Sequence, residues 1–345
     1  MIPARHQDFV NMLFSDDHAA RMLHDDPEGY RRRLDEYLGI GRMHVGKRSA
    51  QKGARGHPVS PLLNTVVCGD CRDVLDRLPE RSVDLVFTSP PYFNARPELG
   101  SFEDYEEYLV FLKSVIEKVG RVLVPGRFFV LNIAPVIVPR ERRSDESKRL
   151  ALPFDAHRLF VESRYTFVED ILWVKPEGAG WVSGRGRRFA ADRNALAYKP
   201  APVTEYVLVY RKQSDRLIDW FLRNHPDRAL VERSKIIGDY EPTNVWRINP
   251  AYSRFHPAVF PLELAEKVIS YYSFENDVVL DPFAGIGTVG TAAMNLSRRF
   301  YLIEREKKYI DRFLEVERAR FEKSWLTGVI QGQDRPVGKT PGMVG

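Results

Sequence analysis

The sequence predicts an α/β protein whose helices cover both faces of a doubly wound, mostly parallel sheet. From residue 64 onward, short runs rich in β-branched and aromatic residues alternate with runs whose apolar residues recur at helical spacing. This alternation is typical of strand–helix–strand units with parallel strands. A glycine-rich turn, DPFAGIGTVG at 281–290, stands between a predicted strand and a predicted helix. Folds of this kind bind ligands beyond the C-terminal ends of their strands, which is where this turn begins.

The first predicted elements occupy residues 64–134. TVVCGD is expected to form a strand, CRDVLDRLP a short helix and VDLVFTS a buried strand. RFFVLNIA is the next expected strand, and it follows a long helix for which Ser101 and Asp104 supply the start signal. That helix has one apolar face, formed by Tyr105, Leu109, Leu112, Ile116 and Val119.

The remaining elements fall on either side of a stretch with no clear period. Two strands, EDILWVKP and TEYVLVYRK, are predicted before residue 213, and the pattern over 213–252 is mixed. From residue 261 the pattern is regular again. It predicts the helix PLELAEKVISYY, the strand DVVLDPF, the glycine turn with its helix, the strand RRFYLIE and the helix KKYIDRFLEVERARF.

Composition and charge limit the class of protein. The chain has 345 residues, of which 43% are hydrophobic and 29% charged, as in ordinary soluble globular proteins. Its apolar runs are too short for a transmembrane helix, and MIPARHQDFV lacks the apolar core of a signal peptide. Two cysteines, Cys68 and Cys71, exclude a disulfide framework and fit a reducing cytoplasm. A net charge of +5 permits a polyanionic partner without requiring one.

The glycine turn can be interpreted in three ways. Gly285, Gly287 and Gly290 satisfy G-x-G-x-x-G, which occurs in dinucleotide-binding enzymes but also where glycines serve only close helix–strand packing. The preceding Asp281 favours a third interpretation, because its carboxylate would repel a pyrophosphate and attract a ligand that carries an ammonium and a sulfonium. Glu304 ends the next strand and suits ribose hydroxyls. S-adenosylmethionine therefore fits this turn better than NAD.

A rigid turn follows another predicted strand. In TSPPY, at 88–92, Pro90 and Pro91 remove two backbone donors, fix φ at about −65° and push Ser89 toward an extended conformation. This turn and DPFAGIGT together resemble the motifs of the amino-group DNA methyltransferases, which methylate N4 of cytosine or N6 of adenine. GDCRDVLDRLPERSVDLVFTSPPY and HPAVFPLELAEKVI are similar to further parts of that family, so the resemblance covers roughly residues 64–320.

The resemblance implies a Rossmann-like methyltransferase sheet in circularly permuted order. The catalytic turn precedes the cofactor turn along the chain, which is the order of the family's β class. In that class a target-recognition insertion lies between the two halves of the fold. The expected organisation is a helical N-terminal extension with a basic linker at 1–60, a catalytic half at 61–212, a target-recognition region at 213–252, a cofactor-binding half at 253–325 and a disordered tail at 326–345.

The chemistry of the family explains the catalytic turn. An exocyclic amine is a poor nucleophile because its lone pair is delocalised into the ring, so groups that accept its hydrogens must expose that lone pair. In the family, the side chain at the position of Ser89 and the main-chain carbonyl after it are these acceptors. Pro90 and Pro91 would hold the turn in advance, and Tyr92 would stack on a base extruded from the duplex. The implied reaction is a direct displacement on the sulfonium carbon, without a covalent enzyme intermediate and without a metal.

The resemblance also names residues for the cofactor, S-adenosyl-L-methionine. Asp70 matches the acid that bonds the adenine amino group of the cofactor, and Phe260 lies in the segment that leads into the cofactor half. The other expected cofactor-binding residues are Asp281, Pro282, Phe283, Gly285, Gly287, Thr288 and Glu304.

Double-stranded DNA is the implied partner. Candidates for contacts with phosphates or guanine edges are Arg185, Arg187, Arg188 and Arg193, although salt bridges to surface acids are an equal alternative. The resemblance leaves a cognate restriction endonuclease and a homodimer open as further partners. We expect a cytoplasmic, DNA-associated prokaryotic enzyme.

The resemblance favours cytosine N4 over adenine N6 as the methylated atom. The family usually pairs Ser-Pro-Pro-Tyr with cytosine and Asp-Pro-Pro-Tyr with adenine. Methylation of cytosine C5 requires a thiolate, typically in a Pro-Cys pair, and neither Cys68 nor Cys71 follows a proline. From other functional classes, a nucleotide-binding dehydrogenase and a non-catalytic DNA-binding protein stay open as alternatives.

Overall fold

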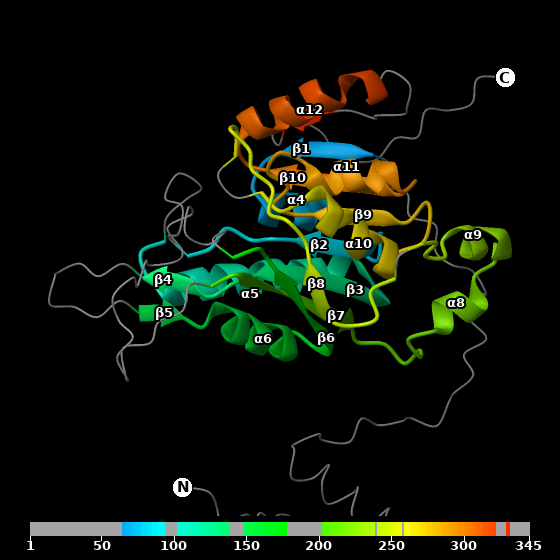
Figure 1. Cartoon of the computed structure of the whole chain (residues 1–345), viewed down its shortest axis with the longest axis horizontal. Helices are drawn as coiled ribbons and strands as arrows, with labels where there is room; N and C mark the ends of the chain where they lie inside the picture. Colours follow the sequence, from blue (N-terminus) through cyan, green and yellow to red (C-terminus); the bar gives the residue numbers. More distant parts are fainter. Residues whose placement is uncertain are drawn as a thin grey trace, which may run out of the picture. The chain divides into compact units, whose positions relative to one another are not determined.

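The computed structural model of the chain describes residues 64–93, 102–138, 148–177, 202–238, 240–256, 259–321 and 329–331 (Figure 1). The predicted N-terminal extension at 1–60 and the arginine-rich stretch at 181–199 lie outside these residues. The described residues all fall in one compact unit, Gly56–Gly345.

One sheet of nine strands runs through the described residues, and its strand order shows the permutation. From one edge to the other the strands are β11 (Val329–Gln331), β1 (Thr65–Cys68), β10 (Arg299–Glu304), β9 (Val278–Asp281), β2 (Val83–Thr88), β3 (Leu123–Ile133), β7 (Thr204–Lys212), β6 (Tyr165–Val174) and β8 (Val245–Arg247). Neighbours pair in parallel except around β7, which is antiparallel to both β3 and β6. Late in the chain, β9 and β10 insert between the early strands β1 and β2. The predicted doubly wound, mostly parallel sheet is confirmed.

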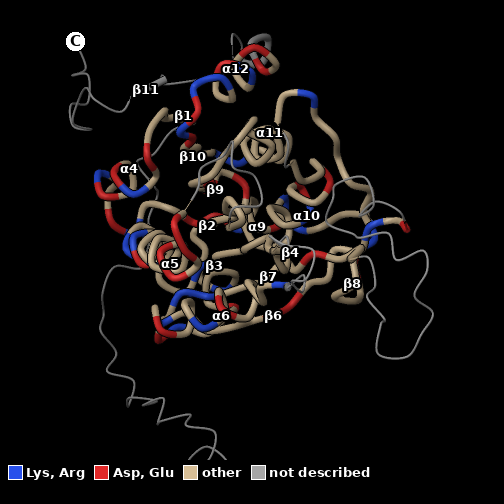
Figure 2. The backbone as a smooth tube through the Cα atoms, turned by 90° about the vertical axis from the view of Figure 1, so that its left-hand side faces the viewer, with Lys and Arg blue, Asp and Glu red and all other residues tan. Residues whose placement is uncertain are grey.

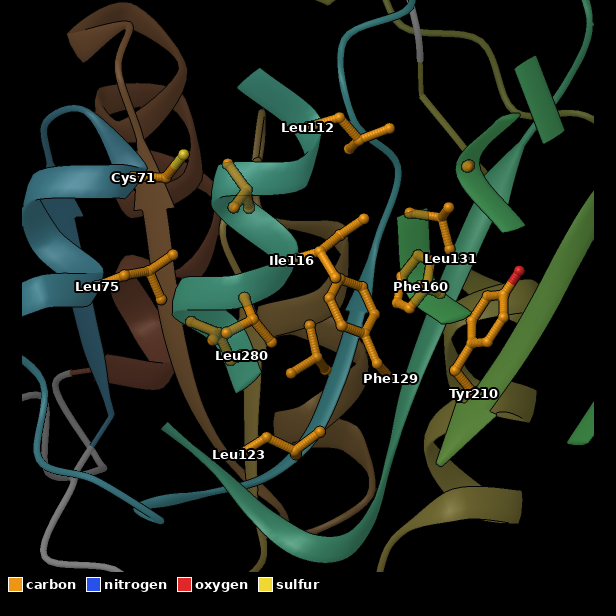
Figure 3. Packing of buried hydrophobic residues seen from close by; sticks show 14 of the residues in the cluster. Cys71, Leu75, Leu112, Ile116, Leu123, Phe129, Leu131, Phe160, Tyr210 and Leu280 are labelled. Atoms are coloured by element: carbon orange, nitrogen blue, oxygen red, sulfur yellow. The ribbon is translucent and has the colours of Figure 1, made fainter. Parts of the chain in front are cut away.

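Helices cover both faces of this sheet, which Figure 2 shows nearly end-on. One face carries α4 (Cys71–Arg77), α5 (Tyr105–Val122) and α6 (Leu152–Glu162), and the other carries α10 (Leu262–Tyr272), α11 (Thr288–Asn295) and α12 (Lys307–Phe321). Each face has its own buried apolar core. In the first core, Ile116 of α5 packs over Phe129 of β3, and Leu75 of α4 lies on the other side of α5 (Figure 3).

Helix α5 begins at Tyr105, directly after Asp104, one of the two residues of the predicted start signal. Asp104 is its N-cap, and its Oδ1 accepts the backbone N–H of Glu107 at 2.8 Å, whereas Ser101 lies outside the described residues. At the start of the predicted apolar face Tyr105 is only partly buried, and Tyr108 takes the buried place beside it. The rest of the predicted face is buried, at Leu109, Leu112, Ile116 and Val119.

Several short elements have no counterpart in the prediction. They are α6, the antiparallel pair β4 (Val136–Val138) and β5 (Lys148–Leu150), and the helices α8 (Trp220–Asn224) and α9 (Arg228–Arg233). In the tail predicted to be disordered, β11 pairs with β1. All of these except the 11-residue α6 are too short to establish a periodic pattern, so neighbouring structure decides them. Among the described residues, no helix is both long and apolar enough to cross a membrane.

Helices α8 and α9 lie beside the N-terminal ends of the parallel strands (Figure 1). Nε of Arg233 lies 2.9 Å from Oε2 of Glu275, and the backbone N of Glu275 donates to Oγ of Ser234 at 2.9 Å, just before β9. The helices bury Phe221 among the strand beginnings, at the opposite end of the strands from the one where doubly wound folds bind ligands. Recognition of the target by 213–252 stays a prediction.

The beginnings of β2, β3 and β9 are joined through one buried arginine. Arg127, 3% exposed, donates from Nε to the backbone oxygen of Asp84 at 2.9 Å and pairs with the carboxylate of Asp277. Its guanidinium also lies over the rings of Phe221 and Phe274, at 5.3 and 5.5 Å. Because Asp277 is itself buried, its charge needs compensation, and Arg127 is the cation that pairs with it directly, while the guanidinium of Arg298 acts at longer range.

Replacement of Arg127 by Met should lower the free energy of unfolding by about 3–5 kcal/mol, because it leaves Asp277 as a buried charge without its counter-ion. The control is Lys113→Met, which breaks the ion pair between Lys113 and Glu162 on the exposed surface and should have a far smaller effect. Urea unfolding of both variants and the wild type measures the difference. Equal losses in the two variants would contradict the role assigned to Arg127.

Candidate active site

A cavity of about 690 Å³ opens beyond the C-terminal ends of the parallel strands. Its wall includes Asp70 after β1, Ser89 after β2, Pro282 after β9 and Glu304 at the end of β10. Strands β9 and β2 are neighbours, but the chain continues from β9 to β10 on one side and from β2 to β3 on the other. The cavity therefore lies at the switch point where doubly wound folds bind ligands. The Ser-Pro-Pro-Tyr turn and the glycine turn, separate in sequence, both contribute to it.

A buried hydrogen bond ties these two turns together. Oγ1 of Thr88 donates to Oδ1 of Asp281 at 2.6 Å, and the backbone N of Phe283 donates to the same oxygen at 3.0 Å. Asp281 is 1% exposed and is not among the residues that line the cavity. This corrects the expectation that its carboxylate faces a cationic ligand, because the side chain turns back under its own turn. Burial raises the pKa of Asp281 to about 7.

The raised pKa of Asp281 predicts how stability depends on pH. The folded protein holds the proton between the ordinary pKa of 3.8 and the folded value of about 7, so the contribution of Asp281 to stability falls as pH rises through that window. Asp281→Asn can keep both hydrogen bonds through its amide oxygen and does not ionise. Its stability relative to the wild type should therefore rise from pH 5 to pH 8 in urea unfolding series. A difference that does not change with pH would show that Asp281 is already ionised at pH 5.

Two of the three glycines in the turn are required by packing. Gly287 has φ +80°, and a Cβ there would lie 2.2 Å from Cδ2 of Phe313 in α12. At Gly290 a Cβ would lie 2.7 Å from Cδ1 of Leu302. The packing interpretation thus holds for these two positions, and Gly287, predicted to bind the cofactor, does not line the cavity. Gly285 does line it.

The carboxylates of Glu304 and Asp70, which follow the ends of β10 and β1, belong to the cavity wall. Glu304 accepts the backbone N–H groups of Gly285 on Oε2 and of Glu306 on Oε1, both at 2.8 Å, and burial raises its pKa. Asp70 caps α4 by accepting the backbone N–H of Arg72 at 2.8 Å, and the guanidinium of Arg72 binds both carboxylate oxygens at 3.0 and 2.8 Å. Hydrogen bonding from Arg72 holds the pKa of Asp70 below its ordinary value.

Aromatic rings from the cores on both faces of the sheet contribute to the cavity wall. The ring of Phe260 is 5.1 Å from that of Phe87 on β2, and the ring of Phe283 is 5.9 Å from that of Phe111 on α5. The structure brings together seven of the nine residues predicted for the cofactor, namely Asp70, Phe260, Pro282, Phe283, Gly285, Thr288 and Glu304.

The predicted catalytic residues Ser89, Pro90, Pro91 and Tyr92 all line the cavity. Pro90 is buried and the other three are partly exposed. The hydroxyl of Tyr92 donates to Oε2 of Glu205, on β7, at 3.2 Å. The Ser-Pro-Pro-Tyr turn is therefore held by hydrogen bonds on both sides, from Thr88 just before it and from Tyr92 at its end.

Glu205 is the centre of a polar group that we call the Glu205 cluster, made of Tyr92, Asn132, Lys175 and Glu205. Nδ2 of Asn132 donates to Oε2 of Glu205 at 2.9 Å and lies 3.5 Å from Oγ of Ser89. Lys175 pairs with Oε1 of Glu205, and its Nζ lies 4.4 Å from the ring centroid of Trp173. All of these residues line the cavity.

Asn132, Lys175 and Glu205 are functional candidates that the sequence prediction does not name. Each stands at the cavity end of a predicted strand, in RFFVLNIA, EDILWVKP and TEYVLVYRK respectively. Burying a polar side chain within an apolar strand costs free energy unless the side chain finds a hydrogen-bond partner. A polar residue at such a position is therefore the signal in the sequence that could have identified these three candidates. Which strands are neighbours, and hence which polar residues meet, depends on the strand order.

The comparisons with known proteins give the family. A family model described as a DNA methylase, which groups N6 and N4 methyltransferases, matches residues 83–315 and so includes both turns. The chain belongs to this family: it is an S-adenosylmethionine-dependent methyltransferase that acts on an exocyclic amino group in DNA. The predicted family and cofactor are confirmed, and the dehydrogenase alternative is set aside.

Individual relatives are similar over most of the chain. The type II methyltransferase M.BglII of Bacillus subtilis is 28% identical over 290 residues, which span 80% of this chain and 76% of that protein. M.ScaI of Streptomyces caespitosus is 29% identical over 256 residues, 70% of this chain and 77% of that one.

Solved structures agree with the fold. A protein from Thermus thermophilus, provisionally described as a DNA modification methylase and crystallised with S-adenosyl-L-methionine, superposes with a TM-score of 0.61 at 31% identity. The match covers 79% of this chain and 100% of that one. The cytosine-N4-specific PvuII DNA methyltransferase shares the fold, with a TM-score of 0.52 at 23% identity over 75% of this chain and 89% of its own.

Proposed function

We propose that the chain transfers a methyl group from S-adenosylmethionine to N4 of a cytosine flipped out of double-stranded DNA. The observation that carries this proposal is that Ser89 and Gly285 line one cavity, while the bond between Thr88 and Asp281 holds their two turns side by side. A methyl donor bound at one turn then lies next to an amine bound at the other. The amine nitrogen attacks the methyl carbon, the carbon–sulfur bond breaks with its electron pair left on sulfur as a neutral thioether, and the nitrogen then loses one proton to solvent water.

The catalytic turn prepares the amine for this attack. Oγ of Ser89 and the main-chain carbonyl that follows it accept the two amine hydrogens, which turns the nitrogen lone pair toward the methyl group. Pro90 and Pro91 have no N–H group to compete for these acceptors, and Pro90 is buried, so the turn is already in place before the base enters. The ring of Tyr92 stacks on the flipped base.

The cofactor side holds the donor through two carboxylates of the cavity wall, Glu304 and Asp70. Glu304 accepts ribose hydroxyls, and Asp70 accepts the adenine amino group, sharing its oxygens with Arg72. Their negative charge also favours a sulfonium cation in this cavity. Asp281 acts on the cofactor indirectly, since its bonds to Thr88 and Phe283 set the shape of the glycine turn.

Cytosine N4 is the favoured atom because the side chain at the first position of the turn is the hydroxyl of Ser89 and not a carboxylate. N6 of adenine is the alternative, since that amine needs the same two acceptors. The state of the thiols disfavours C5 of cytosine. Burial raises the pKa of Cys71, which lines the cavity, to about 12, so it supplies no thiolate near neutral pH.

We assign DNA contacts to the arginine-rich stretch between β6 and β7. The backbone N of Lys175 donates to the carbonyl of Val203 at 2.8 Å, and both ends of the stretch adjoin residues of the cavity wall. The described chain therefore stops and resumes beside two residues of the cavity wall, Lys175 and Glu205. The four arginines predicted to contact DNA, Arg185, Arg187, Arg188 and Arg193, belong to this stretch and lie outside the described residues. A cognate restriction endonuclease would fit the type II relatives.

Substitution of Ser89 by Ala should lower kcat by at least about 100-fold, because it removes one of two acceptors for the amine. Binding of S-adenosylmethionine, measured by calorimetry, should change by less than about twofold. Ser163→Ala, at the end of α6 and outside the cavity, is the matched control and should retain wild-type activity. A Ser89→Ala enzyme that turns over at the wild-type rate would refute the assigned role.

The methylated base can be identified directly. DNA from a bacterial host that expresses the chain is digested to nucleosides and separated by liquid chromatography with mass detection, and single-molecule sequencing of the same DNA locates the site. We expect N4-methylcytosine in one sequence context. N6-methyladenine in its place would transfer the proposal to the adenine alternative.

A further inference from the structure

The carboxylate of Glu205 is unusually well surrounded for a residue outside the predicted site. It is 5% exposed, and the donors it accepts come from three different parts of the sheet: Tyr92 after β2, Asn132 on β3 and Lys175 after β6. Two of these donors share Oε2, whereas Lys175 binds Oε1. Only an ionised carboxylate accepts on both oxygens without offering a hydrogen of its own.

Lys175 stabilises the negative charge of Glu205. A buried carboxylate without a counter-ion takes up a proton or destabilises the fold. The side chain of Lys175 is 14% exposed and that of Glu205 is 6% exposed, so the pair is largely withdrawn from water. Trp173, beneath the ammonium at 4.4 Å, adds a favourable ring face for the cation.

The cluster reaches the catalytic turn at two points. Tyr92, whose ring stacks on the base in the proposed function, is held by its hydroxyl. The amide of Asn132 lies between Glu205 and Ser89, with Nδ2 at 2.9 Å from the carboxylate and 3.5 Å from Oγ of Ser89. Asn132 is 2% exposed, so its amide has little freedom to move away.

We propose that Glu205, kept ionised by Lys175, is a positioning residue that sets the orientation of both Ser89 and Tyr92 toward the target base. It does not touch the reacting atoms. The single carboxylate of Glu205 fixes both the hydroxyl of Ser89, which accepts from the amine, and the ring of Tyr92, which stacks on the base. The positions of these two groups are therefore coupled. This inference rests on the proposed amine-methylating function and deepens it.

The substitution Glu205→Gln tests the proposal. The amide cannot accept from Lys175 on one side and from both Tyr92 and Asn132 on the other, so the two catalytic side chains lose their shared anchor. Displacement of reacting groups by about 1 Å can cost roughly 100-fold in rate. We expect kcat to fall by about 10- to 100-fold, while calorimetric binding of S-adenosylmethionine stays within about twofold of the wild type.

A matched pair at Lys175 separates positioning from a merely structural role. Lys175→Met removes the counter-ion, so the pKa of Glu205 should rise, and kcat at pH 6.5 should fall about tenfold and recover toward pH 9 as Glu205 ionises. Lys175→Arg keeps the cation and should follow the wild-type pH profile. A simple loss of packing would lower the activity of Lys175→Met equally at every pH.

The outcomes distinguish this proposal from the function on which it rests. A wild-type protein that methylates neither cytosine nor adenine in DNA would overturn the proposed function itself. A wild-type protein that methylates DNA, with Glu205→Gln and Lys175→Met at the wild-type kcat, would overturn the positioning role alone. If Glu205→Gln does not fold, the Lys175 pair decides by its pH profiles.

Discussion

The hydrogen bond between Thr88 and Asp281 connects residues that are 193 positions apart, and the rest of the site is arranged around it. On one side of it the chain continues into the Ser-Pro-Pro-Tyr turn, and on the other into the glycine turn. Because both partners are buried and both strands are paired in the sheet, neither turn can shift without the other. A transfer between two ligands requires such a fixed relation, since the reacting atoms must meet in line. The fold supplies that relation before either ligand arrives.

Buried charges are stabilised in different ways at the two ends of the strands. Where the strands begin, Arg127 and Asp277 form a complete ion pair that serves stability. Where the strands end, Asp281 and Glu304 are stabilised by hydroxyl and backbone N–H donors and have no cationic partner within the described hydrogen bonds. Of these two, Glu304 lines the cavity, and its ionised form would suit a cationic methyl donor. Glu205, in the same cavity wall, is paired with Lys175.

Much of the fold and the larger part of the site follow from local sequence patterns. The strand of TEYVLVYRK coincides with β7, and the two turns lie where strand–turn–helix logic places them. The prediction fails where a side chain's direction depends on tertiary packing. Asp281 bears a carboxylate at a strand end, but only the neighbouring Thr88 shows that it points inward. Likewise, the meeting of Asn132, Lys175 and Glu205 depends on the order β3, β7, β6, which no local pattern contains.

The placement of β9 and β10 between β1 and β2 has a consequence for synthesis of the protein. As the ribosome releases the chain, β1 and one edge of β2 emerge long before the strands that pair with them. At ordinary elongation rates, on the order of 10–40 s separate the appearance of β2 and β9. During that time the nascent polypeptide exposes unpaired strand edges, which are prone to aggregation. The cavity wall is incomplete until Glu304 has been made, so a product that terminates before this residue lacks the glycine turn or the carboxylate beside it and is expected to be inert rather than merely weaker.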